Sequence, residues 1–134
     1  MEKIKIYCKK CNVRLTDELL EIGQDEIHFP VEEEAIPEGR FVFFKHNSVL
    51  SILINSNQEL LKNHADSSRF YGCCGSDGTN GYNKVCVNNH EVATEFSDCY
   101  TSCYIEISLK NTIVKQINDI GEFEVMKFKY FTLK

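Results

Sequence analysis

The sequence lacks any long apolar run, whereas a membrane-spanning helix needs roughly eighteen or more consecutive apolar residues. Lysines occur near the start of the chain, but neither an apolar stretch nor a small-residue cleavage site follows them, so this segment does not have the form of a secretory signal. We therefore expect no membrane segment and a cytoplasmic location. Proline is also scarce, and both prolines, Pro30 and Pro37, fall within residues 23–39, which we expect to form a long loop.

Basic residues are in the minority. The chain has 15 Lys and Arg against 20 Asp and Glu, which gives a net charge of −5. A surface of this sign repels phosphates on average, so non-specific nucleic-acid binding loses its main driving force. The acidic balance, with the run Glu32–Glu34, suits a basic partner instead.

The length of 134 residues, with 43% hydrophobic and 26% charged residues, is typical of a single globular domain spanning residues 1–134. Residues 56–63 have a cap residue and good helix formers, which predicts a short helix. Residues 16–22 fit either a helix capped by Thr16 or a strand. Residues 65–83 are rich in turn dipeptides. Strands are predicted from β-branched and alternating patterns over residues 2–7, 40–45, 48–54, 104–109, 111–117 and 122–133. We therefore predict an α+β fold rich in antiparallel strands.

Cysteine, in contrast, is abundant, with seven residues. In a reducing compartment persistent disulfides are rare, and clustered cysteines more often bind metal. Cys8 and Cys11 have the C-x2-C spacing that lets one tight turn direct two thiolates at one zinc ion. Two unrelated core cysteines or a redox dithiol would give the same spacing, but the other cysteines can complete a metal site. The sequence therefore predicts that Cys8 and Cys11 form half of a zinc site.

The second half of the site is less regular in sequence. We predict Cys74 and Cys86 as its ligands, because Gly75 directly after Cys74 allows the turn that brings backbone amides toward the sulfur. Cys73 can substitute for Cys74, and His90, four residues after Cys86, can supply a nitrogen ligand. Cys99 and Cys103 are expected to be core residues or further ligands, and the alternating strand that follows Cys103 favours a buried thiol.

The stretch from residue 66 to residue 100 resembles a segment of a family of small bacterial cysteine-rich, zinc-ribbon-like proteins. The shared pattern is Cys73-Cys74-Gly75, then Cys86-x3-His90-Glu-Val-Ala-Thr-Glu, then Asp98-Cys99, and the Cys8-x2-Cys11 pair matches as well. The chain departs from the pattern at Tyr100, where the family has Trp, and at Cys103, where it has His. Some of these proteins resemble immunity proteins that inhibit bacterial toxins, so the resemblance implies a metal-stabilised protein of that type.

Other chemistries find weaker support. A cysteine hydrolase could use Cys73 or Cys74 with His90 and Asp98, or with His64 and Asp66, but nothing in the sequence brings these residues together. A catalytic zinc site would need an open position, and the second His of H-E-x-x-H is missing. The glycines of residues 72–81 lack the Lys-Ser/Thr ending of a phosphate loop.

We accordingly expect a single zinc ion to clasp the N-terminal turn to the glycine-rich middle loop. The function predicted is that of a non-enzymatic protein-binding protein, most concretely an immunity or antitoxin-type inhibitor of a basic bacterial toxin. An alternative is a zinc-ribbon module associated with nucleic acid or the ribosome, supported by Lys9, Lys10 and Arg14 around the first cysteine pair. A zinc or cysteine hydrolase is the weakest of the three.

Overall fold

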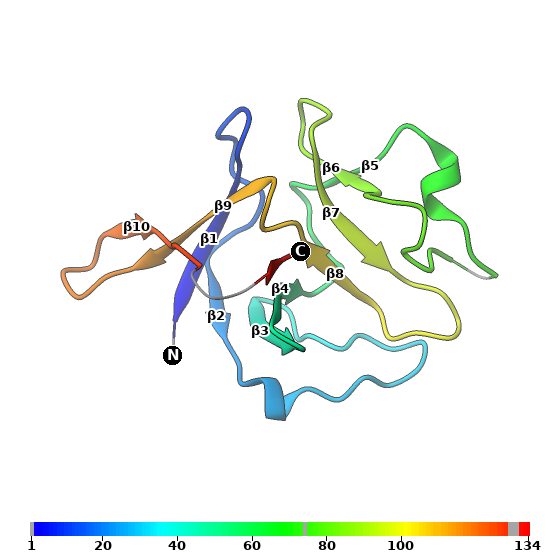
Figure 1. The fold of residues 1–134 in the computed structure, drawn as a ribbon, viewed down its shortest axis with the longest axis horizontal. Helices are drawn as coiled ribbons and strands as arrows, with labels where there is room; N and C mark the ends of the chain where they lie inside the picture. Colours follow the sequence, from blue (N-terminus) through cyan, green and yellow to red (C-terminus); the bar gives the residue numbers. More distant parts are fainter. Residues whose placement is uncertain (1, 74, 129–131) are drawn as a thin grey trace.

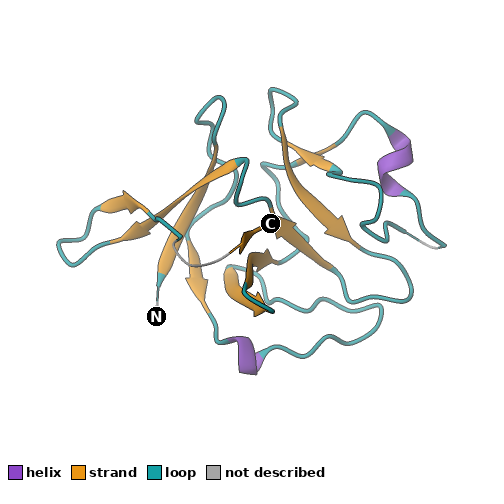
Figure 2. Cartoon of the chain, viewed as in Figure 1, coloured by secondary structure: helices purple, strands orange, loops and turns teal. Residues whose placement is uncertain are grey.

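The computed structural model describes residues 2–73, 75–128 and 132–134. Within them the chain forms one mixed sheet and two short 3-10 helices, η1 (Gln24–Glu26) and η2 (Ser67–Phe70) (Figures 1 and 2). The strands in chain order are β1 (Lys3–Cys8), β2 (Leu19–Glu21), β3 (Arg40–His46), β4 (Val49–Ile54), β5 (Lys62–Asn63), β6 (Lys84–Val85), β7 (Glu91–Phe96), β8 (Tyr104–Ile107), β9 (Thr112–Ile117), β10 (Phe123–Val125) and β11 (Thr132–Leu133).

The strands follow the order β10-β9-β1-β2-β3-β4-β8-β7-β6-β5 across the sheet, and β11 pairs with β4 outside this path. Neighbours pair antiparallel except β2 with β3 and β11 with β4, which are parallel. β1 and β7 are therefore separated by four intervening strands in the hydrogen-bonded order. Figure 1 nevertheless shows the turn after β1 and the turn before β7 at the same end of the molecule, because the sheet curls.

The sheet has apolar residues on both faces. The larger cluster lies on one face and includes Ile6, Phe41, Ile52 and Ile107, each with no exposed surface. The second cluster combines Ile22, Ala35 and Ile36 from the loop region with Val42 and Leu53 from the sheet. Residues 23–39, predicted as a loop, thus cover part of the second face.

The prediction of an α+β fold is wrong. In the part of the chain that the structure describes, there is no α-helix, and the fold is nearly all β. Residues 56–63 do not form the predicted helix, because the side chains of Asn55 and Gln58 satisfy the local backbone. Asn55 accepts the N–H of Asn57, and Gln58 donates to the carbonyl of Asn55. An isolated helix of this length is marginal in water, so these turn bonds prevail.

Most of the predicted strands are present. The segments 2–7, 40–45, 48–54 and 111–117 correspond to β1, β3, β4 and β9, and β8 begins the segment 104–109. Residues 16–22, for which either a helix or a strand was possible, contain the strand β2. Thr16 does not cap a helix; its hydroxyl accepts the backbone N–H of Ile6. The segment 122–133 gives two short strands, with residues 129–131 outside the described residues. No described helix has the length and apolar character needed to cross a membrane.

Candidate metal centre

The first half of the candidate centre is the turn that ends β1. Cys8 donates its N–H to the carbonyl of Val13, and Asn12 donates to the carbonyl of Cys8. Asn12, directly after Cys11, has a φ of 61°, a left-handed conformation that asparagine adopts more readily than most residues. The turn therefore closes over two intervening residues and directs Cys8 and Cys11 to the same side.

The second half is the turn between β6 and β7. Cys86 donates its N–H to the carbonyl of His90, and Asn89 donates to the carbonyl of Cys86. Asn89 also has a positive φ, 66°. A left-handed asparagine thus closes each of the two turns, and each turn presents two potential metal ligands.

The four donor atoms lie together at distances that suit one ion. The Sγ atoms of Cys11 and Cys86 are 3.8 Å apart, and Nδ1 of His90 is 3.5 Å from the Sγ atoms of both Cys8 and Cys86. All four donor atoms lie within 4.8 Å of one another. Zinc–ligand bonds of about 2.3 Å to sulfur and about 2.0 Å to nitrogen place tetrahedral donors about 3.8 Å apart for two sulfurs and about 3.5 Å apart for sulfur and nitrogen. The three separations of 3.5, 3.5 and 3.8 Å therefore match edges of a tetrahedral zinc site.

The surroundings of Cys11 and Cys8 act on their thiols in opposite directions. Hydrogen bonding from the Asn88 side chain is the largest influence on Cys11, and together with the backbone of Val13 it lowers the pKa of this thiol to about 6. Burial raises the pKa of the Cys8 thiol, although backbone N–H groups partly oppose the rise. Each sulfur faces the backbone of the residue two positions on: Lys10 for Cys8, Val13 for Cys11 and Asn88 for Cys86.

The imidazole of His90 has a defined role in this geometry. Its Nδ1 faces the two sulfurs, so a metal ion would take the lone pair of Nδ1 and the ring proton would reside on Nε2. Beside it, Glu91 accepts hydrogen bonds from Arg69 at 2.7 Å and from His64 at 3.0 Å. His64 Nδ1 accepts the N–H of Asp66, which leaves its Nε2 as the donor to Glu91.

Asn111 connects the two turns, although no pattern in the sequence points to it. It lies between β8 and β9, where its carbonyl accepts the N–H of Lys9 at 3.1 Å. Its side-chain amide donates to the carbonyl of Glu91 at 3.1 Å. One residue therefore holds both ligand-bearing turns, and only the tertiary structure reveals it because its partners lie 20 or more positions away.

The structure brings together Cys8, Cys11 and Cys86 of the predicted ligand set, and the predicted substitute His90 joins them. Cys74 lies outside the described residues. Among the residues that are described, no other donor group of this kind is found, so Cys73, Cys99 and Cys103 do not join the cluster. Cys103 is half-buried rather than buried, and burial raises the pKa of its thiol.

The acids considered for a cysteine hydrolase contact the backbone. His90 faces the sulfur cluster, and both carboxylate oxygens of Asp98 accept backbone N–H groups, from Cys73 and from Cys99. The alternative acid, Asp66, caps Ser68 with its carboxylate.

Comparison with known proteins adds no relative. No protein family model, curated protein or solved structure matches the chain. No matched protein therefore indicates what this chain binds or does. What the site shows is a group of three cysteines and one histidine that can hold a metal ion.

Proposed function

We propose that the cluster binds one zinc ion and that this ion is structural. The observation that carries the proposal is the set of four protein donors at tetrahedral spacing. Four protein ligands leave no position for water or substrate, as in structural zinc sites, whereas catalytic sites keep one position open. The ion would join turns that lie four strands apart in the sheet order, so it would hold the curled sheet closed.

Metal analysis of protein purified without added metal tests this directly. We expect about one zinc per chain, a zinc–sulfur coordination shell by X-ray absorption spectroscopy, and release of the ion by a strong chelator with loss of structure. A protein that folds fully without metal would contradict the structural role. An iron content of one per chain would contradict the choice of zinc, because iron also accepts tetrahedral thiolate ligands.

We further propose that the protein is a non-enzymatic, zinc-stabilised binding protein, most concretely an inhibitor of a basic bacterial toxin. The net charge of −5 supports a basic partner, because charge complementarity accelerates association and selects the partner. The closed ligand set supports a role without catalysis, and the resemblance of residues 66–100 to small bacterial cysteine-rich proteins supports the immunity type.

The test is co-expression with the product of the adjacent gene, which we expect to be a secreted toxin. We expect the chain to restore growth of cells that express the toxin domain and to co-purify with it as a stable complex. The Cys11→Ser variant should lose both effects, because the fold would loosen. If the neighbouring product is not toxic, or is toxic and neither bound nor neutralised, the proposal fails.

One observation favours a second candidate, a nucleic-acid-binding module. A pocket of about 320 Å³ beside the cluster is lined by three lysines and one carboxylate, together with two histidines and two asparagines: Lys9, Lys10, Lys110, Glu91, His64, His90, Asn89 and Asn111. Phosphate contacts by three lysines would give binding that weakens steeply with salt. A titration of single-stranded RNA at two salt concentrations separates the candidates, and a Lys9→Gln/Lys10→Gln variant should abolish RNA binding while leaving toxin inhibition intact.

A further inference from the structure

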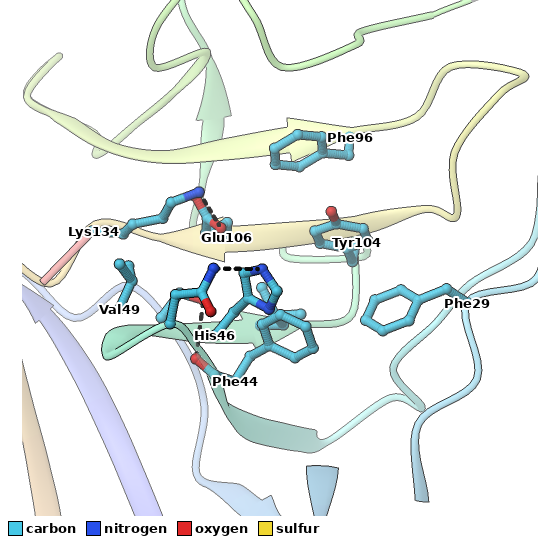
Figure 3. A pocket seen from close by; sticks show the side chains of 11 residues that line it. Phe29, Phe44, His46, Val49, Phe96, Tyr104, Glu106 and Lys134 are labelled. Atoms are coloured by element: carbon cyan, nitrogen blue, oxygen red, sulfur yellow. Dashed lines mark hydrogen bonds and ion pairs between the residues drawn. The ribbon is translucent and has the colours of Figure 1, made fainter. Parts of the chain in front are cut away.

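An apolar groove of about 370 Å³ lies across β3, β4, β7 and β8 (Figure 3). The strand register explains its lining. Phe44 on β3 pairs with Ser51 on β4, and Phe96 on β7 pairs with Tyr104 on β8. Because side chains alternate along a strand, paired residues share one face of the sheet. This is the face opposite the larger core cluster.

The groove is the part of this face that the long loop leaves uncovered. Ile22, Ala35 and Ile36 pack over Val42 and Leu53, and beyond them the loop contributes Phe29 at the edge of the groove. Phe29 is 44% exposed, although its ring has aromatic neighbours. A large aromatic side chain held by its neighbours yet open to solvent is typical of the anchor residues of protein interfaces.

Aromatic rings form one wall of the groove. The ring of Phe29 packs edge-on against Phe44 at 5.6 Å and against Tyr104 at 5.8 Å between centroids. Tyr104 also stacks on Phe96 at 4.8 Å. Figure 3 shows Phe29, Phe44 and Tyr104 grouped at one end of the groove. These contacts fix the rings before any partner binds, and aromatic faces attract both apolar groups and cations.

A carboxylate lies within this apolar setting. Glu106 pairs with Leu53 in the sheet register, and its side chain is only 20% exposed. Burial raises the pKa of Glu106, partly opposed by Lys134, whose ammonium lies 3.7 Å away. The side chain of Lys134 is itself 56% exposed. The half-buried carboxylate of Glu106 thus has one described charge partner, Lys134. Because the Lys134 side chain is largely in solvent, breaking this ion pair costs little free energy.

We propose that this groove binds an arginine or lysine side chain of a basic protein partner, which pairs with Glu106 in place of Lys134 and lays its aliphatic stem against the aromatic wall. Lys134 shows that the groove accommodates a cation at this carboxylate. The net charge of −5 favours the approach of such a partner. The inference rests on the proposed protein-binding function and names the surface that performs it.

Two labelled peptides test the groove. The first places one arginine between leucines, and the second replaces that arginine by citrulline, which has the same shape without the charge. We expect the arginine peptide to bind at least tenfold more tightly, measured by fluorescence anisotropy, and to shift the amide resonances of β3, β4, β7 and β8. Equal binding of the two peptides, no binding of either, or resonance shifts elsewhere would overturn the proposal.

Variants distinguish a specific role of the Glu106 carboxylate from the effect of the overall negative charge. Glu106→Gln should weaken the arginine peptide at least tenfold and leave the citrulline peptide unchanged, whereas Lys134→Met should strengthen the arginine peptide severalfold by removing the internal competitor. Glu122→Gln, on the exposed turn between β9 and β10, makes the same charge change away from the groove and should have no effect. If Glu106→Gln and Glu122→Gln behave alike, the proposal is refuted.

The peptide assay is independent of any toxin. Failure of the peptides therefore leaves proposed toxin inhibition standing on its own co-expression test. Conversely, if the chain binds the arginine peptide through Glu106 but neutralises no toxin, the groove proposal holds and the proposal of toxin inhibition fails. Phe29→Ala, a change at an exposed loop position, should weaken both peptides, and unchanged binding of both would remove the aromatic wall from the proposal.

Discussion

Replacing Cys11 by serine is the sharpest test of the clasp. Structural zinc sites contribute about 10–16 kcal/mol of apparent binding free energy at neutral pH, shared among four ligands. Loss of one thiolate should therefore cost about 3–4 kcal/mol, which corresponds to roughly a hundredfold to a thousandfold weaker zinc binding. A domain of this size loses about 3–5 °C in Tm per kcal/mol, so Tm should fall by roughly 10–20 °C.

The assay combines thermal unfolding by circular dichroism with a zinc titration against a chromogenic chelator. Cys103→Ser is the matched control, because Cys103 is half-buried and lies outside the donor cluster. It should change Tm by only a few degrees and leave zinc affinity unchanged. If the Cys11 variant does not fold, the wild-type protein with and without chelator provides the same comparison. Equal Tm and equal zinc affinity for the two serine variants would refute the reasoning.

Three further predictions concern stability. Asn111→Ala removes the side-chain bond to the carbonyl of Glu91 and should cost about 1–2 kcal/mol, with a measurable fall in zinc affinity. Denaturant unfolding checks the loss of stability, and Asn57→Ala, which removes a side-chain bond to Glu38 at an exposed position, is the control. Gly78 has a φ of 77°, and a Cβ there would collide with the ring of Phe96, so Gly78→Ala should destabilise by about 1 kcal/mol or more; an unchanged midpoint would contradict this. Burial raises the pKa of Glu106 in the folded state, so the contribution of this side chain to the free energy of unfolding is most favourable below the unfolded pKa of about 4.3 and is lost as pH rises through the folded pKa. The stability of Glu106→Gln relative to wild type should therefore increase between pH 4 and pH 7. A stability difference that does not change with pH would show that burial of the charge is not responsible.

The pH prediction has a consequence for the groove. If Glu106→Gln is more stable than wild type at neutral pH yet binds the arginine peptide less well, the carboxylate is held at a cost to folding. Such a trade is common where a residue is retained for binding rather than for stability. The same variant therefore links the stability and binding measurements.

Local patterns in the sequence were sufficient for several features. The strands β1, β3, β4 and β9 follow from alternating and β-branched runs, which reflect a period of two and a buried face. The spacing of Cys8 and Cys11 indicates a metal-binding turn, because two intervening residues close the loop whatever surrounds it. The position of His90 four residues after Cys86 indicates a possible nitrogen ligand.

Other features depend on contacts between distant residues. The helix predicted over residues 56–63 is replaced by turns because Asn55, buried against the carbonyl of Ile36, fixes the chain from outside the segment. A helix of this length is only marginally stable by itself, so such tertiary contacts determine the conformation of the segment. The groove likewise arises from register across four strands, which no single segment encodes.

Spacing and alternation act over a few residues, so they suffice to predict a strand-rich acidic chain with a cysteine turn suited to metal. The meeting of the turn after β1 with the turn before β7, and the place of His90 in the donor group, are visible only in the folded chain. The curl of the sheet brings these turns together across four strands. Such proximity depends on the path of the whole chain, and local pattern carries no information about it.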